Sequence, residues 1–361
     1  MESHSTDDPI RADHRTLASL LQKSIQRGDA GLAQAAAFAL LKLKGPAVWR
    51  RLLQVAFVDI GSASLDILLS AAALWSEPKG RKSADVLIVA ATTIAKRLAG
   101  SPKDRSAADL LHAVYHPSFD SLRHKYKRGN GADLTSLADP STLIYERAVN
   151  VCAALGVEWN KELPKTSRHN LHELMRVYRQ LGVPDALVNT TAEASTVLRL
   201  PSIPLVPLVY LARRGCRSWI SRMRQRQVPL VHRIPVYVLD GTTRIGRMAV
   251  RRFVVENSSV RRCLEEHVAS FSRIAAAYLA AYHVDAVVLV KRSVWEQSDK
   301  ITALGIESDF ARAGVPFSSI NPLVQTFRDH IAQFDAIRRE LVADNIRDAR
   351  IFDRTNPPIF P

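Results

Sequence analysis

The chain has 361 residues, 47% of them hydrophobic and 24% charged, which is the composition of a folded globular protein and excludes extended disorder. This length is sufficient for two or three domains, each with its own hydrophobic core. The net charge of +15 lies almost wholly in residues 121–262, where 24 basic residues stand against 10 acidic ones, and such segregation is typical of a surface that binds a polyanion.

Residues 1–13 are polar and are expected to form a disordered tail, without the apolar core of a signal peptide. The longest apolar tracts, 200–212 and 272–290, are interrupted by prolines or charged residues, so we predict neither a membrane span nor a membrane partner. An odd number of cysteines without a Cys-x-x-Cys pair indicates the reducing cytoplasm. These cysteines are Cys152, Cys216 and Cys263.

Residues 14–116 are predicted to form a helical bundle. A helix from His14 is expected to end at Gly28, because glycine readily adopts the left-handed conformation that follows a helix. Asp29 then caps an alanine-rich helix, which the Gly-Pro pair at 45–46 breaks.

The third helix of this bundle has one apolar face and one basic face. Trp49, Leu52 and Leu53 are expected to be buried against the helix of residues 32–40. Arg50 and Arg51 are expected to stay accessible.

These elements also carry a run of motifs: Lys-Ser-x-x-Arg-Gly-Asp, the alanine-rich helix, Trp-Arg-Arg-Leu, and Asp-Ile-Gly. With the segment IAKRLAGSPKDRSAADLL of residues 94–111, this order resembles the helical C-terminal region of the RarA/MgsA replication-associated recombination ATPases, which are relatives of the clamp loaders. The resemblance covers about residues 14–115, and Val58 stands where the family usually has Glu. The matching residues are Lys23, Ser24, Arg27, Gly28, Asp29, Arg50, Arg51, Leu52, Asp59, Ile60 and Gly61.

The phosphate-binding loop of an ATPase is missing from the sequence. That loop has the pattern G-x-x-x-x-G-K-[ST], and the nearest segment, 241–246, has neither the lysine nor the following hydroxyl residue. The resemblance therefore implies a scaffold without ATPase activity and without a cofactor. It also implies replication or clamp-loader proteins, or further copies of the chain, as protein partners.

Residues 117–141 are predicted to be a basic linker loop between two domains, because they combine prolines and glycines with a basic cluster around Tyr126. Basic side chains beside an aromatic ring can bind phosphates and stack on bases; a solvated basic loop is the equal alternative. The basic residues of this cluster are Arg123, Lys125, Lys127 and Arg128.

The densest basic cluster lies in residues 212–227, which are expected to include a short helix with Trp219 as an apolar anchor. Arginine favours bidentate phosphate contacts, so DNA or RNA is the predicted partner; an arginine-rich helix packed on acidic residues is the alternative. Elsewhere in the chain, His169 and His172 lie close together but belong to no metal-binding pattern, so no metal site is predicted. The arginines of the cluster are Arg213, Arg214, Arg217, Arg222, Arg224 and Arg226.

Residues 228–239 are predicted to form a strand that ends at a turn containing Asp240. Asp240 could handle a metal or a proton, with Thr243 and Arg244 holding a phosphate at the start of the next helix. The alternative is a turn aspartate, a capping threonine and a surface arginine. A long helix over 258–283 and a second strand over 285–293 are predicted to follow.

The expected fold is mainly α, with a bundle of the clamp-loader C-terminal type in residues 14–116. A mostly helical second domain with a few short strands is expected in residues 142–350, followed by an extended tail, 351–361. The predicted function is that of a non-ATPase nucleic-acid-binding accessory or scaffold protein in DNA replication, recombination or repair. The alternatives are a nucleic-acid-processing enzyme centred on Asp240 and a protein-interaction adaptor that does not bind DNA.

Overall fold

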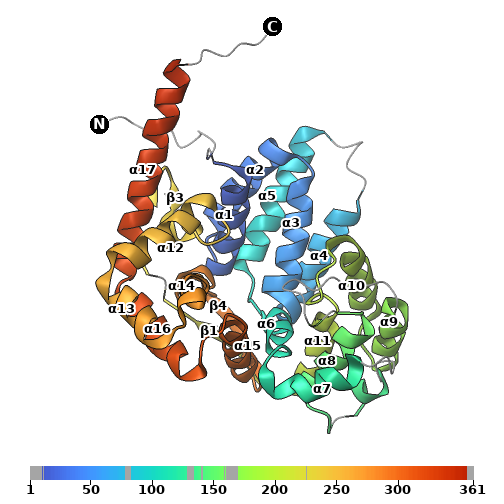
Figure 1. Ribbon diagram of the computed structural model, residues 1–361. Helices are drawn as coiled ribbons and strands as arrows, with labels where there is room; N and C mark the ends of the chain where they lie inside the picture. The colour runs from blue at the N-terminus through green and yellow to red at the C-terminus, as the bar shows by residue number, and fades with distance from the viewer. Residues whose placement is uncertain are drawn as a thin grey trace.

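A computed structural model describes most of the chain, and the described part is mainly α-helical, as the sequence predicts (Figure 1). Seventeen α-helices and four short strands lie in the described residues. For residue 127 and residues 345–355 only the backbone is described. The described residues are 10, 12–77, 83–127, 134–139, 141–157, 159, 170–224 and 226–355.

The amino-terminal bundle begins and ends its helices where local chemistry predicts. Asp13 caps the first helix by accepting hydrogen bonds from the amides of Arg15 and Thr16. Gly28 ends that helix at a φ of 74°, and the Asp29 side chain accepts from the amide of Leu32. The helices of this bundle are α1 (His14–Arg27), α2 (Ala30–Lys44), α3 (Ala47–Val55), α4 (Leu65–Ser76) and α5 (Ala84–Gly100).

A second group of helices follows in the middle of the chain. Tyr178 is fully buried among them and donates a hydrogen bond to the carbonyl of Pro204. The helices are α6 (Ser106–Ala113), α7 (Asp120–Lys127), α8 (Ile144–Ala154), α9 (Leu171–Gln180), α10 (Asp185–Leu198) and α11 (Leu205–Arg213).

The third group of helices packs around an aromatic centre, where the Phe253 ring lies 5.0 Å from that of Phe334 and 5.4 Å from that of Phe327. The long helix predicted over 258–283 is in fact two helices, because the chain is extended at Val268. The helices are α12 (Arg244–Glu256), α13 (Ser258–His267), α14 (Arg273–Ala281), α15 (Ser298–Arg312), α16 (Phe317–Asp329) and α17 (Ile331–Thr355).

Short turns of other helical types connect these elements. Two are π-helical, η1 (Ala56–Ile60) and η7 (Tyr282–Ala286). The others are 3₁₀ turns: η2 (Gly61–Ala63), η3 (Pro117–Phe119), η4 (Leu134–Leu137), η5 (Val236–Val238) and η6 (Ser270–Ser272).

The strands form two small antiparallel pairs. In the first, β1 (Ser218–Arg222) pairs with β4 (Lys291–Trp295), so that Trp219 lies opposite Val294. The predicted helix for the arginine cluster is therefore wrong at its centre, where these residues are extended and hydrogen-bonded to a distant strand. The second pair consists of β2 (Leu230–Val231) and β3 (Ile234–Pro235).

The two predicted strands are also displaced. Within residues 228–239 the chain forms the hairpin of β2 and β3 and then a 3₁₀ turn, because Pro235 follows directly on Ile234 and cannot donate a ladder hydrogen bond. The strand predicted over 285–293 begins instead at Lys291, after the turn η7.

The hydrophobic cores do not follow the predicted division of the chain. One core joins Leu53, Phe57 and Leu110 to Tyr178 and Leu208, so it extends across the predicted linker 117–141. Another joins α1, α2 and α3 to Ile234, Tyr237 and Val238. The amino-terminal bundle therefore shares its cores with both later parts of the chain, which lie on either side of it in Figure 1.

Candidate functional site

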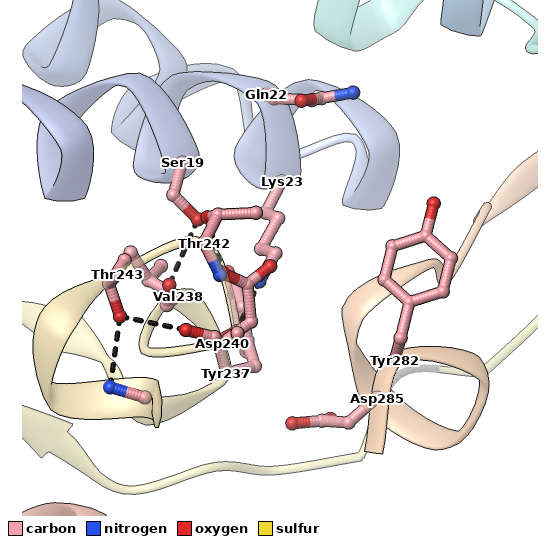
Figure 2. Close-up of polar contacts among 12 residues, drawn as sticks. Ser19, Gln22, Lys23, Tyr237, Val238, Asp240, Thr242, Thr243, Tyr282 and Asp285 are labelled. Atoms are coloured by element: carbon pink, nitrogen blue, oxygen red, sulfur yellow. Dashed lines mark hydrogen bonds and ion pairs between the residues drawn. The ribbon is translucent and has the colours of Figure 1, made fainter. Parts of the chain in front are cut away.

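Lys23, which the resemblance selects, and Asp240, the candidate carboxylate, meet across the junction between α1 and the turn after η5 (Figure 2). The Lys23 Nζ lies 2.6 Å from Asp240 Oδ2 and donates a hydrogen bond to the carbonyl of Tyr237 at 2.7 Å. Both side chains are more than nine-tenths buried. Burial lowers the pKa of Lys23 to about 8, although the attraction of Asp240 acts in the opposite direction.

Besides forming the ion pair, Asp240 stabilises the turn in which it lies. Its Oδ1 accepts hydrogen bonds from the amide and the hydroxyl of Thr242, at 2.9 and 2.5 Å. Burial raises the pKa of Asp240, but Lys23 and these hydrogen bonds outweigh it, so the net pKa is lowered and the carboxylate is charged at neutral pH.

Thr243 is the amino-terminal cap of α12. Its hydroxyl donates to the carbonyl of Asp240 at 2.9 Å and accepts from the amide of Gly246 at 3.0 Å. Arg244 is exposed and makes no ion pair within the described residues. The structure thus brings Asp240 and Thr243 together through one turn, while Arg244 takes no part in their contacts.

Arg27 continues the junction toward η7. Its guanidinium stacks 3.8 Å from the centre of the Tyr237 ring and donates to the carbonyl of Asp285 at 2.5 Å. Asp285 also accepts from Arg226 and Arg338 at 3.3 and 2.7 Å. Burial acts to raise the pKa of Asp285, but these arginines hold it at about 2.

Asp59 is the third buried carboxylate that contacts side chains of α1. It accepts from the side-chain amides of Gln22 and Gln26 at 2.8 Å each, and from Arg105 at 2.5 Å. Gly61 follows at a φ of 52°, where an added Cβ would lie 2.4 Å from the carbonyl oxygen of Asp104, so a side chain cannot fit.

The remaining motif residues have structural contacts or face solvent. Ser24 is buried and donates to the carbonyl of Leu20 at 2.5 Å. Arg50 is exposed, as expected, but Arg51 is only partly exposed. Arg51 is not a free surface residue because it donates to the Gln22 side chain at 2.6 Å.

A cavity of about 420 Å³ opens beside the ion pair of Lys23 and Asp240. Residues of α1 and Arg51 of α3 form part of its lining, and the rest consists of Asp240, Thr242, Tyr282, Ala286 and Val287. Tyr282 projects from η7 on the side opposite Lys23 (Figure 2). We call this space the junction cavity.

The second candidate region is the strand β1 with its flanking residues, which we call the β1 surface. All five strand residues are exposed. The side chains of Arg217, Arg222 and Arg224 are exposed and make no ion pair or hydrogen bond within the described residues. Trp219 is 56% exposed and lies in the same strand as Arg222.

Other residues of the two predicted basic clusters hold the fold together. Arg213 pairs with Asp104 at 2.7 Å, and Arg226 pairs with Asp335. Arg123 is buried and pairs with Asp120. Two further residues of these clusters have only surface contacts: Arg214 donates to the carbonyls of residues 181 and 182, and Lys125 lies 5.6 Å from the centre of the Tyr126 ring. The side chain of Lys127 is not described, and Arg128 lies outside the described residues.

One polar cluster has no signal in the sequence. His112 Nδ1 lies 2.7 Å from Asp309 Oδ1, and His283 Nε2 lies 3.5 Å from Asp309 Oδ2. Burial acts to raise the pKa of Asp309, but the two histidines outweigh it and leave the pKa far below its usual value. The cluster lines a pocket of about 220 Å³ that shares Tyr282 and Val287 with the junction cavity. Its three residues are too far apart in the sequence to form a motif.

Comparison of the chain with family models, curated proteins and solved structures yields no match. The resemblance of residues 14–115 therefore rests on its motifs and stays a prediction. Within the described residues, no group of His, Cys, Asp and Glu side chains is arranged to hold a metal ion.

No described helix is both long and apolar enough to cross a bilayer. The three cysteines are free thiols.

Proposed function

We propose that this protein binds nucleic acid through the β1 surface and serves as a non-ATPase accessory or scaffold protein in DNA replication, recombination or repair. The supporting observations are that the side chains of Arg217, Arg222 and Arg224 are exposed and have no described partner, and that Trp219, in the same strand as Arg222, is half-exposed. Guanidinium groups without a carboxylate partner are available for phosphate oxygens, and an exposed aromatic ring can stack on a base.

The position of these arginines distinguishes them from the basic residues that stabilise the fold. Arg213 and Arg226 belong to the same predicted cluster, but each is already paired with a buried carboxylate. Neutralising either would therefore disturb folding as well as binding. The β1 arginines can be changed without leaving a buried charge unpaired.

The test measures the affinity for DNA and RNA oligonucleotides as a function of salt concentration. The variant Arg217→Gln/Arg222→Gln/Arg224→Gln should bind more weakly to all sequences alike, because phosphate contacts do not specify sequence. Each lost contact should reduce the slope of log K against log salt by about 0.9 for duplex DNA and about 0.7 for single strands.

The matched control is Arg50→Gln/Arg251→Gln/Arg339→Gln. These three arginines are also exposed and without a described partner, and they lie on α3, α12 and α17. The control removes the same net charge and should leave most of the slope intact. Equal losses of affinity in both triple variants would mean that only net charge matters, and they would contradict binding through the β1 surface.

Trp219→Ala separates single-stranded from duplex ligands. If a base stacks on this ring, single-strand binding should weaken by about 1–3 kcal/mol while duplex binding changes little. Absence of salt-dependent binding in the unchanged protein would instead favour the adaptor that does not bind DNA.

A further inference from the structure

The junction cavity contains more positive than negative charge. Arg15, Lys23 and Arg51 line it against a single carboxylate, that of Asp240. Lys23 already neutralises Asp240 at a distance of 2.6 Å. Two guanidinium groups therefore remain without a counter-charge in the lining.

Arg51 forms no ion pair within the described residues, although the charges of Asp59 and Asp240 act on it from a greater distance. Its hydrogen bonds go to uncharged oxygens: the side chains of Gln54 and Gln22 at 3.1 and 2.6 Å, and the carbonyl of Ala18 at 3.4 Å. Its Nε is buried and has no hydrogen-bond partner in the described structure. Burial lowers the pKa of Arg51, so the charged form is held at a cost that a bound anion would offset.

Gln26 is also a lining residue, and its side chain carries a second unsatisfied atom, which lies beneath the surface of the cavity. Its side chain is buried, with 2% of its surface exposed, and its amide nitrogen donates to Asp59. Because a carboxylate can only accept, this contact fixes the orientation of the amide and leaves Oε1 as the free acceptor. The Oε1 atom has no donor within the described residues.

We propose that the junction cavity binds the phosphate monoester of a small organic ligand. A phosphate monoester has a charge of about −1.5 to −2 at neutral pH, which matches the two unpaired guanidinium groups of Arg15 and Arg51 better than one carboxylate would. A cavity of about 420 Å³ has room for more than a bare phosphate ion.

The same chemistry occurs in free nucleotides and at the 5′-phosphate end of a nucleic acid. Calorimetric titration of the full chain would use inorganic phosphate, adenosine 5′-monophosphate, adenosine, and one short oligonucleotide with and without its 5′-phosphate. We expect saturable binding of the monophosphate and none of adenosine. Tight binding of the 5′-phosphorylated oligonucleotide beyond its 5′-hydroxyl form identifies the nucleic-acid end as the source; monophosphate binding alone identifies a free nucleotide.

Arg15→Gln and Arg51→Gln should each weaken monophosphate binding by at least about tenfold, the loss expected for one charged hydrogen-bonding group. Arg50→Gln is the neighbouring control and should change nothing, because Arg50 is exposed and does not line the cavity. Arg15 is also exposed, so its variant is expected to fold normally and keeps the test valid if Arg51→Gln unfolds.

Binding of the monophosphate in the junction cavity can be tested separately from binding of nucleic acid at the β1 surface. The triple variant at Arg217, Arg222 and Arg224 should bind the monophosphate with unchanged affinity, and Arg51→Gln should keep the salt dependence of 5′-hydroxyl oligonucleotides. The inference is overturned if no phosphate-bearing probe binds at millimolar concentration, or if adenosine binds as tightly as its monophosphate.

Discussion

Lys103 is fully buried, and its ammonium group donates to the carbonyls of Ala99 and Ser101 at 2.5 and 2.6 Å. No carboxylate lies within ion-pair distance of it among the described residues. Burial is the largest cause that lowers its pKa from 10.5 to about 7, and the charge of Lys291 acts in the same direction. Lys103 therefore loses its proton at a lower pH in the folded chain than in the unfolded chain.

The sign of the resulting pH dependence follows from proton linkage. Below pH 7 both states carry the proton on Lys103; between about pH 7 and 10.5 the folded state has lost it and the unfolded state has not. Stability therefore rises with pH in this interval. Lys103→Met should reduce that slope by up to about 1.4 kcal/mol per pH unit.

Denaturant unfolding at a series of pH values above 7 measures this slope. Lys44→Met is the control, because Lys44 is exposed on α2 and should leave the slope unchanged. Lys23 has a lowered pKa too, so the unchanged protein is expected to retain part of the slope after Lys103 is replaced. Identical slopes in the Lys103 variant and the unchanged protein would mean that the buried amine does not titrate in this range.

At the scale of single elements, α3 buries the three apolar residues that its spacing predicts, but Leu53 packs in the core of Leu68 and Leu110 and not in the core of α2. Leu52 is 1% exposed and belongs to the core that includes Ala36, Ala37 and Leu40 of α2. Leu52→Ala should lower the free energy of unfolding by about 2–5 kcal/mol, because it removes buried methyl groups and leaves a cavity.

Leu43 provides the matched comparison for this prediction, since it lies on α2 and is 50% exposed. Leu43→Ala should change stability by less than about 0.5 kcal/mol. Chemical denaturation of both variants decides the matter; a loss at Leu52 no greater than the loss at Leu43 would contradict the burial of this helix face.

The elements also show where prediction from the sequence ends. The boundary between α1 and α2 depends on Gly28 and Asp29, whose effect is local, so it can be predicted. The strand β1 depends on pairing with residues 291–295, which no local pattern encodes. Its arginines therefore look helical in the sequence and are extended in the fold.

The candidate sites divide in the same way. The cap formed by Thr243 is local and can be predicted, whereas the partner of Asp240 is Lys23, a residue of the first helix. The surroundings of Asp309 likewise combine His112 with His283 across three parts of the chain. Exposure is equally invisible in the sequence: Arg217 and Arg213 look alike there, but only Arg213 is held by a buried carboxylate.

At the scale of the whole molecule, the amino-terminal bundle depends on the rest of the chain for its core. Leu53, Phe57 and Leu110 pack with Tyr178 and Leu208, and Tyr237 covers the other side of the bundle. A fragment of residues 14–116 would expose both apolar surfaces. We expect it to lack a cooperative thermal transition and to bind a hydrophobic dye, as loosely packed helical states do.

Circular dichroism melts of this fragment and of the full chain provide the comparison. A sharp transition in the fragment, together with little dye binding, would contradict this prediction and support an independent domain of residues 14–116.

The contact of Lys23 with the carbonyl of Tyr237 joins residues 214 positions apart. During translation at about 5–20 residues per second, roughly 10–40 s pass after α1 leaves the ribosome before its partner segment is made. During this interval the face of α1 that will later contact residues 237–285 has no partner. It includes Ser19, Lys23 and Arg27, which water can solvate. A nascent helix with a hydrated seam resists premature association with other chains better than one with an all-apolar face, so the charged junction would protect the protein while it is still being made.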